Sequence, residues 1–175
     1  FFGSDCEQLY AEIQQDYDFT NNYVTYWVKV PALSATSDSK IHMYFDAFKP
    51  DNNQFIGDTG ESAAQNVWDN SFVGVWHMAN NPESQVSDST VNAIHATSAG
   101  AMTSNDLIDG VIGKSIEFDG VDDVLDTHYN SVLDITQSVT VEAIATKTVD
   151  DTDNYLLTRG DADTSGEDQK SYGFS

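Results

Sequence analysis

The chain has 175 residues, with 29 acidic against 7 basic side chains and a formal net charge of −22. This charge repels polyanions, so we expect neither nucleic acid nor an anionic membrane surface as a partner. No apolar run approaches the length of a membrane span, and a hydrophobic fraction of 39% suffices for one large or two small domains. The acidity has three interpretations: adaptation to salt, a supply of carboxylates for Ca²⁺, or a solvated surface with no further role.

Short runs of alternating apolar and polar residues recur along the chain, separated by segments rich in Asp, Asn, Ser and Gly. In chain order they predict strands at residues 9–14, 23–30, 41–46, 116–118 and 139–145. Residues 72–78 form a nearly continuous apolar run, as in a strand buried on both faces, and residues 61–68 could form a short helix. No stretch of ten or more residues has convincing helical periodicity. The pattern therefore predicts an all-β fold built of antiparallel sandwiches.

Cys6 is the only cysteine of the chain, so an internal disulfide is excluded. We expect it to be a small, partly buried residue. Among the histidines, His77 lies inside the apolar run of residues 72–78, and a hydrogen-bonded core position is the favoured interpretation over a ligand role. His95 is expected to be structural.

Two runs in the first part of the chain carry a family resemblance. Residues 27–33 read WVKVPAL and residues 40–45 read KIHMYF. Together they resemble an uncharacterised β-rich domain family that often lies directly ahead of a LamG domain in secreted bacterial, archaeal and phage-encoded proteins. This predicts a domain boundary near residues 66–72.

Four runs in the second part of the chain carry a second family resemblance. They read VWHM at 75–78, DSTVNAIHAT at 88–97, GVIGKSIEFDGVDDVLD at 110–126 and SVTVEA at 138–143. In this order they resemble LamG-type (laminin-G-like, concanavalin A-like) jelly-roll domains. The resemblance implies a jelly roll at residues 71–175, with only its N-terminal part present, after a smaller β-sandwich unit at residues 1–70. We expect a piece of a longer polypeptide, with the missing strands supplied by the rest of that chain or by neighbouring subunits.

The LamG resemblance also implies a candidate Ca²⁺ site. In such folds the loops corresponding to residues 88–92 and 119–123 are adjacent at one sandwich edge, and several relatives bind calcium there. The ligands would be Asp88, Asn92, Asp119 and Asp122, which offer the oxygens that Ca²⁺ prefers. The alternative is a pair of ordinary turns capped by Asp and Asn side chains.

The chain departs from the family in this loop and in the following strand. Val91 and Ala93 replace the glycines of the family's turn, where glycine usually supplies a positive φ. Ile144 replaces an expected tryptophan. These departures put the local geometry of the loop in doubt, and with it any ligand site that the loop would build.

Residues 161–166, DADTSG, match the first six positions of an EF-hand loop. Tyr172 stands at position 12, where a bidentate Glu is needed. A solvated acidic loop is therefore the favoured interpretation.

Aromatic side chains in two predicted neighbouring strands suggest a carbohydrate site. Tyr23, Trp27 and Tyr44 could form an exposed row on which sugar rings stack. The alternative is that they face the core, because half of the positions in such strands must do so.

A catalytic site is the least favoured interpretation. Glu117, Asp119 and Asp122 faintly echo the carboxylates of concanavalin A-like glucanases, which act as nucleophile and acid/base. Gly120 and Val121 indicate a turn at this point, where such enzymes have a continuing strand.

We therefore expect a non-catalytic glycan-binding or adhesion module of a large extracellular or virion-surface protein, with Ca²⁺ as a candidate cofactor. Its partners would be a carbohydrate or cell-surface glycan and other subunits or the rest of a longer chain, without membrane insertion. A structural spacer or assembly subunit is the first alternative. A polysaccharide-degrading enzyme is the second.

Overall fold

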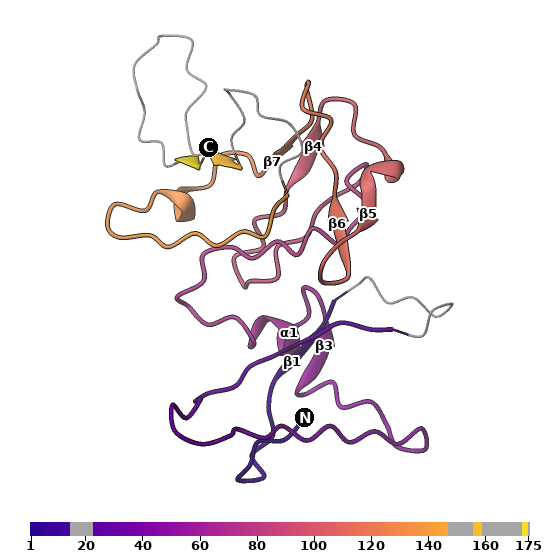
Figure 1. The fold of residues 1–175 in the computed structure, drawn as a ribbon, viewed down its shortest axis with the longest axis vertical. Helices are drawn as coiled ribbons and strands as arrows, with labels where there is room; N and C mark the ends of the chain where they lie inside the picture. Colours follow the sequence, from indigo (N-terminus) through magenta and orange to yellow (C-terminus); the bar gives the residue numbers. More distant parts are fainter. Residues whose placement is uncertain (15–22, 147–155, 159–172, 175) are drawn as a thin grey trace. The chain divides into compact units, whose positions relative to one another are not determined.

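The computed structural model describes residues 1–14, 23–146, 156–158 and 173–174. Its contacts divide the chain into two compact units, residues 1–134 and residues 135–175. Strands of two or three residues dominate, and the described part contains a single α-helix of four residues, α1 (Ser62–Gln65) (Figure 1). The all-β class is confirmed at this level, as is a short helix within residues 61–68. A jelly-roll sandwich stays a prediction, because the sheets are small and separate.

The first sheet has the strand order β2-β1-β3, with β1 (Ala11–Ile13), β2 (Tyr26–Val28) and β3 (Ile56–Asp58). β2 pairs with β1 antiparallel, which places Trp27 opposite Glu12, and β3 pairs with β1 in parallel. α1 packs against β1 and β3 through its two buried alanines (Figure 1). The middle strand, β1, is therefore flanked on both edges and contacts the helix. The side chain of Glu12 in this strand is buried.

Two strand pairs follow in the same unit: β4 (Thr97–Ala99) with β7 (Val124–Asp126), and β5 (Leu107–Asp109) with β6 (Lys114–Ile116). β5 and β6 form a hairpin in which the N–H of Gly110 donates to the carbonyl of Gly113 at 2.8 Å. Gly113 has a φ of 64°, which a glycine adopts without a steric cost. The glycines at the start of the 110–126 run thus close this hairpin. Short 3-10 turns occur at η1 (Ser104–Asp106) and η2 (Ser131–Leu133).

A hydrophobic cluster fills the space among these strands. Its members are Val86, Ala96, Met102 and Ile116, with Trp76, Met78, Leu107 and Leu125 packed against them. Val86 and Ala96 also exchange two backbone hydrogen bonds of 2.8 and 2.9 Å. The apolar residues of the 75–78 and 110–126 runs therefore contribute to one core.

Three predicted strands are not strands in the structure. Residues 72–78 make one isolated bridge, between Trp76 and Asp88, and residues 41–46 make one, between His42 and Phe2. Residues 139–145 have no strand, and Ile144 is exposed. A strand requires a paired neighbour over several residues, and the described part of the chain supplies these segments with one bridge at most.

The contacts of the structure cross the boundary predicted at residues 66–72. The side chain of Glu12 in β1 is hydrogen-bonded to His77 and Ser89, on the far side of that boundary. The second unit contains one antiparallel pair, β8 (Leu157–Thr158) with β9 (Gly173–Phe174). None of the helices in the described ranges is long and apolar enough to cross a membrane.

Candidate functional site

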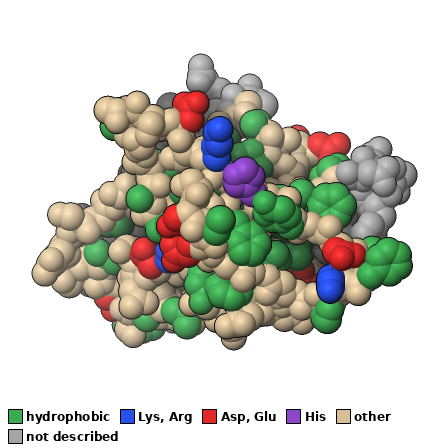
Figure 2. All heavy atoms as spheres, turned by 90° about the horizontal axis from the view of Figure 1, so that it is seen from below, with side chains coloured by type: hydrophobic (Ala, Val, Ile, Leu, Met, Phe, Trp, Pro, Cys, Tyr) green, Lys and Arg blue, Asp and Glu red, His purple; other side chains and the backbone are tan. Residues whose placement is uncertain are grey.

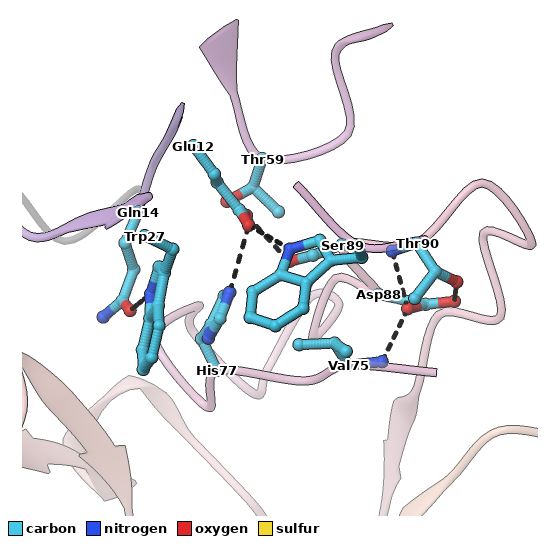
Figure 3. A network of polar contacts seen from close by, with 10 residues as sticks. Glu12, Gln14, Trp27, Thr59, Val75, His77, Asp88, Ser89 and Thr90 are labelled. Carbon is cyan, nitrogen blue, oxygen red and sulfur yellow. Dashed lines mark hydrogen bonds and ion pairs between the residues drawn. The ribbon is translucent and has the colours of Figure 1, made fainter. Parts of the chain in front are cut away.

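The carboxylate of Glu12 is the centre of a buried polar network in the first unit. Its side chain is 0% exposed. One oxygen accepts hydrogen bonds from Thr59 Oγ1 at 2.6 Å and Ser89 Oγ at 2.7 Å. The other accepts from Trp68 Nε1 at 2.6 Å and contacts His77 Nε2 at 3.2 Å (Figure 3). Four segments that are far apart in the sequence therefore converge on one carboxylate.

The rings of His77 and Trp27 border this network. The side chain of His77 is 8% exposed, and its ring stacks on that of Trp27 with centroids 4.6 Å apart and planes inclined by 13°. Trp27 is fixed in turn by its Nε1, which donates to Gln14 Oε1 at 2.7 Å (Figure 3). The expectation of a hydrogen-bonded core histidine at position 77 is confirmed.

The charge state of Glu12 follows from these contacts. Burial alone would raise the pKa of its carboxyl, because a charged group loses its hydration. The hydrogen bond and the electrostatic interaction with His77, together with hydrogen bonds from Thr59 and Trp68, outweigh burial and hold the pKa of Glu12 below its ordinary value. A carboxylate with both oxygens engaged and no exposed surface fits a structural role, since neither oxygen is presented to a substrate.

Asp88, one of the predicted calcium ligands, forms a second buried centre in the turn at residues 88–94. One of its oxygens accepts from the backbone N–H groups of Val75 and Thr90, each at 2.9 Å. The other accepts from Thr90 Oγ1 at 2.8 Å (Figure 3) and from the N–H of Ile94 at 2.9 Å. Its own N–H donates to His95 Nδ1 at 3.1 Å, so His95 has the structural role expected of it. The turn is thus wrapped around Asp88, whose acceptor positions are occupied by protein donors.

The two replaced glycines of this turn behave differently. Ala93 has a φ of 50°, the left-handed region that glycine would favour, whereas Val91 is not among the positive-φ residues and is largely exposed. The predicted ligand Asn92 lies between them, and its amide donates to the carbonyl of Val73 at 2.9 Å. Of the two positions, Ala93 therefore adopts a conformation that glycine favours, and Val91 does not.

The other two predicted ligands, Asp119 and Asp122, lie together in an exposed group with Asp123. One carboxylate oxygen of each lies within 4.8 Å of the others. Asp119 Oδ1 accepts from the N–H of Val121 at 2.8 Å, and this bond is the main cause that lowers the pKa of Asp119 below its ordinary value. Gly120, with a φ of 74°, allows the tight turn. This group offers three carboxylates to a cation, whereas Ca²⁺ takes six to eight oxygens, so water or further ligands would have to complete a site.

An open groove of about 550 Å³ lies beside Trp68 in the first unit. It is lined by Trp68, by Val91 and by polar side chains: Lys29, Ser62, Gln65, Asn66, Asp69, Asn70 and Ser71. Lys29 Nζ donates to the carbonyl of Asn66 at 3.2 Å and lies 4.0 Å from a carboxylate oxygen of Asp69. Hydrogen bonds from Ser71 lower the pKa of Asp69, which keeps it charged.

The predicted glycan-binding aromatics do not form one row. Trp27 belongs to the buried network, whereas Tyr44 is 72% exposed and makes an edge contact with Phe2, with ring centroids 5.6 Å apart. Tyr23 is half-buried. Glu117, one of the three carboxylates considered for the least favoured, catalytic interpretation, is exposed. Residues 161–166, the partial EF-hand pattern, lie outside the described residues.

No protein-family model, no curated protein and no solved structure matches this chain. The resemblance to LamG-type domains and to the β-rich family ahead of them therefore stays a prediction.

Sequence reasoning missed Glu12, Trp68 and the groove. Glu12 and Gln14 alternate with apolar residues in a strand, which indicates a solvated face, yet the structure buries both. A signal was present in Trp27, Trp68 and His77, since buried indole and imidazole N–H groups need acceptors. The expectation for Cys6 was wrong: it is exposed, with a φ of 64°, because it lies in a tight turn closed by the bond from its N–H to the carbonyl of Gly3.

Proposed function

We propose that the chain is a non-catalytic glycan-binding or adhesion module of an extracellular or virion-surface protein, with a LamG-type jelly roll in its second part. The observation that carries this proposal is the groove beside Trp68. Sugar-binding sites combine an apolar aromatic surface with amide, hydroxyl and charged groups that form hydrogen bonds with the hydroxyl groups of the sugar ring. The groove offers both kinds of group within one open hollow.

The tryptophan of the groove is held in place from the interior. Its Nε1 is bonded to the buried Glu12, and its ring meets Phe72 edge-on, with centroids 5.2 Å apart and planes at 74°. A ligand that contacts Trp68 would therefore not need to order its side chain, which lowers the entropic cost of binding. The buried network thus supports the groove without taking part in any chemistry.

The charges favour a neutral glycan. Lys29 and Asp69, the two charged residues of the groove, have opposite signs and lie within 4.0 Å of each other. The chain as a whole has a net charge of −22, which repels sialylated, sulfated and uronic acid glycans. We therefore expect neutral hexose oligosaccharides to bind better than anionic ones.

The proposal is tested with a glycan array that contains neutral and anionic oligosaccharides, run with and without Ca²⁺, followed by titration of the best ligand. Asn70→Ala is the informative variant. The side chain of Asn70 has no hydrogen-bond partner among the described residues, so we expect the variant to fold as the natural chain does. We expect a loss of affinity of about fivefold to tenfold, as for one hydrogen bond to a ligand. Tyr44→Ala is the matched control, an exposed aromatic residue that does not line the groove.

The outcomes separate the alternatives. Reduced binding by Asn70→Ala with unchanged binding by Tyr44→Ala supports the groove. The reverse result would assign binding to the exposed aromatic residues outside it. Failure of the folded chain to bind any glycan on the array would overturn the proposed function.

A further inference from the structure

Residues 41–48 form an exposed apolar segment in the first unit, here called the edge segment. Phe45 is 88% exposed and Phe48 is 97% exposed, and Ile41, Met43 and Tyr44 are exposed as well. Figure 2 shows several hydrophobic side chains exposed on one face of the molecule, among acidic, basic and histidine side chains. An aromatic side chain has roughly 150–250 Å² of surface, so three of them expose several hundred Å². That is a large part of the roughly 800 Å² that each partner contributes to a stable interface.

Among the described residues, the backbone of the edge segment is bridged at one position, His42. His42 and Phe2 exchange two backbone hydrogen bonds, each of 2.9 Å. Ile41, Met43 and Phe45 make no backbone hydrogen bond to any other described residue. The segment is not a strand in the structure, but when it pairs as one, these three odd-numbered residues direct their backbone groups to the edge opposite Phe2, because successive residues of a strand alternate between its edges. An unpaired strand edge is a template for a further strand.

We infer that the edge segment pairs antiparallel with the same segment of a second copy of this chain, about a two-fold axis at Met43. This inference stands apart from the glycan-binding proposal and does not require it. A two-fold interface uses the same surface patch on both subunits, so the segment must complement itself.

The charges of the sequence select this register. With the axis at Met43, Ile41 lies opposite Phe45 of the second copy, and Lys40 lies opposite Asp46, twice by symmetry. Among two-fold axes at the odd-numbered residues Ile41, Met43 and Phe45, the one at Met43 alone brings a lysine opposite an aspartate. Opposite charges at facing positions stabilise a strand pair, and like charges destabilise it.

The edge segment is also where two such acidic chains can meet. Residues 38–49 contain two aspartates and two lysines and are neutral, although the whole chain carries −22. Lys40 has no ion pair among the described residues. Approach through this segment therefore avoids local repulsion, and salt screens the rest.

The experiment measures the mass of the 175-residue chain by light scattering and sedimentation over a range of concentrations. We expect a concentration-dependent dimer. Lys40→Asp should weaken dimerisation about tenfold, because two facing pairs become repulsive. The double variant Lys40→Asp with Asp46→Lys restores opposite charges in the proposed register and should recover the affinity of the natural chain.

A crosslinking series locates the axis. In a Cys6→Ser background, Met43→Cys should form an intersubunit disulfide, because directly facing residues lie at about the Cα separation that a disulfide spans. Tyr44→Cys is the matched control, since its facing residue in this register is His42. A monomer of the 175-residue chain at all concentrations would overturn the inference. So would a dimer in which the charge exchange fails to restore affinity or Tyr44→Cys crosslinks as well as Met43→Cys.

Discussion

The acidic residues of this chain fall into two groups that the structure treats in opposite ways. Glu12 and Asp88 are buried, and each carboxylate has four contacts from polar groups of the protein. Asp119, Asp122 and Asp123 are grouped at the surface, with their oxygens close together. Residue type alone does not distinguish the groups, because Asp88 and Asp119 both begin turns and both accept backbone hydrogen bonds. The difference lies in how many donors surround each carboxylate, which decides whether it organises the fold or is available to a cation.

The largest effect is expected when the centre of the buried group is removed. Glu12→Ala would leave the donors of Thr59, Trp68 and Ser89 without a buried acceptor and would remove the contact with His77. Breaking such a buried arrangement costs about 3–5 kcal/mol. Chemical denaturation of the first unit measures the loss. Glu117→Ala, at an exposed glutamate, should change the free energy of unfolding by less than about 0.5 kcal/mol. Equal losses for both variants would contradict a structural role for Glu12.

Removal of Asp88 should cost somewhat less. Asp88→Ala leaves three backbone N–H groups, of Val75, Thr90 and Ile94, without their acceptor, and we expect a loss of about 2–4 kcal/mol. Asp119→Ala should cost much less, because water reaches its donors. Denaturation midpoints of the two variants compare the two turns directly. If Asp119→Ala proved the more damaging, the assignment of structural and surface roles would have to be reversed.

The sequence predicted the class of the fold better than it predicted which carboxylates are buried and which lie at the surface. Alternation correctly indicated strands around β1, β2 and β6, because one side chain in two must face an interior. It could not show that Glu12 faces the interior as well, since that depends on Thr59, Trp68, His77 and Ser89 arriving from distant segments.

The family resemblance had a similar limit. It grouped Asp88 with Asp119 as ligands of one ion, because both lie in turns of the motif. Whether an aspartate in a turn points inward or outward is decided by tertiary packing, which the motif does not contain. The same is true of residues 41–46 and 72–78, where an apolar pattern was present but the described part of the chain supplies only one bridge to each.

Acidification should weaken the contribution of Glu12. Its folded pKa lies below its ordinary value, so its stabilising contribution is complete above the unfolded pKa of about 4.3 and is lost as the pH falls through the folded pKa. The measurement is the difference in unfolding free energy between the natural chain and Glu12→Gln at pH 7 and at pH 3.5, with sulfate added to keep both folded. We expect this difference to shrink at pH 3.5, because a protonated Glu12 resembles glutamine. A difference that does not change with pH would show that the charge of Glu12 has no part in the stability.

Calcium binding is a further way to distinguish the surface group, Asp119, Asp122 and Asp123, from the buried carboxylates. If Asp119, Asp122 and Asp123 bind Ca²⁺, the melting temperature should rise in millimolar CaCl₂ beyond its rise in NaCl of matched ionic strength. At ten times the dissociation constant the gain is about 1.4 kcal/mol. Asp119→Ala should abolish the calcium increment, and Asp51→Ala, at an exposed aspartate elsewhere, should keep it. Identical melting curves in the two salts would exclude a specific site in this group.

The smallest effect concerns the backbone of the buried turn. Ala93 has a φ of 50°, and a left-handed conformation costs an L-residue about 1–2 kcal/mol. Ala93→Gly relieves this strain but adds about 0.4–1 kcal/mol of entropy to the unfolded chain, so a net gain near 0.5 kcal/mol is expected.

Gly100→Ala is the converse change beside the exposed group: Gly100 has a φ of 100°, and an added Cβ would meet the carbonyl of Asp122. It should destabilise the chain by more than about 1 kcal/mol. Thermal unfolding of both variants gives the signs, and a loss of stability in Ala93→Gly would mean that the methyl group of Ala93 contributes more by packing than its φ costs.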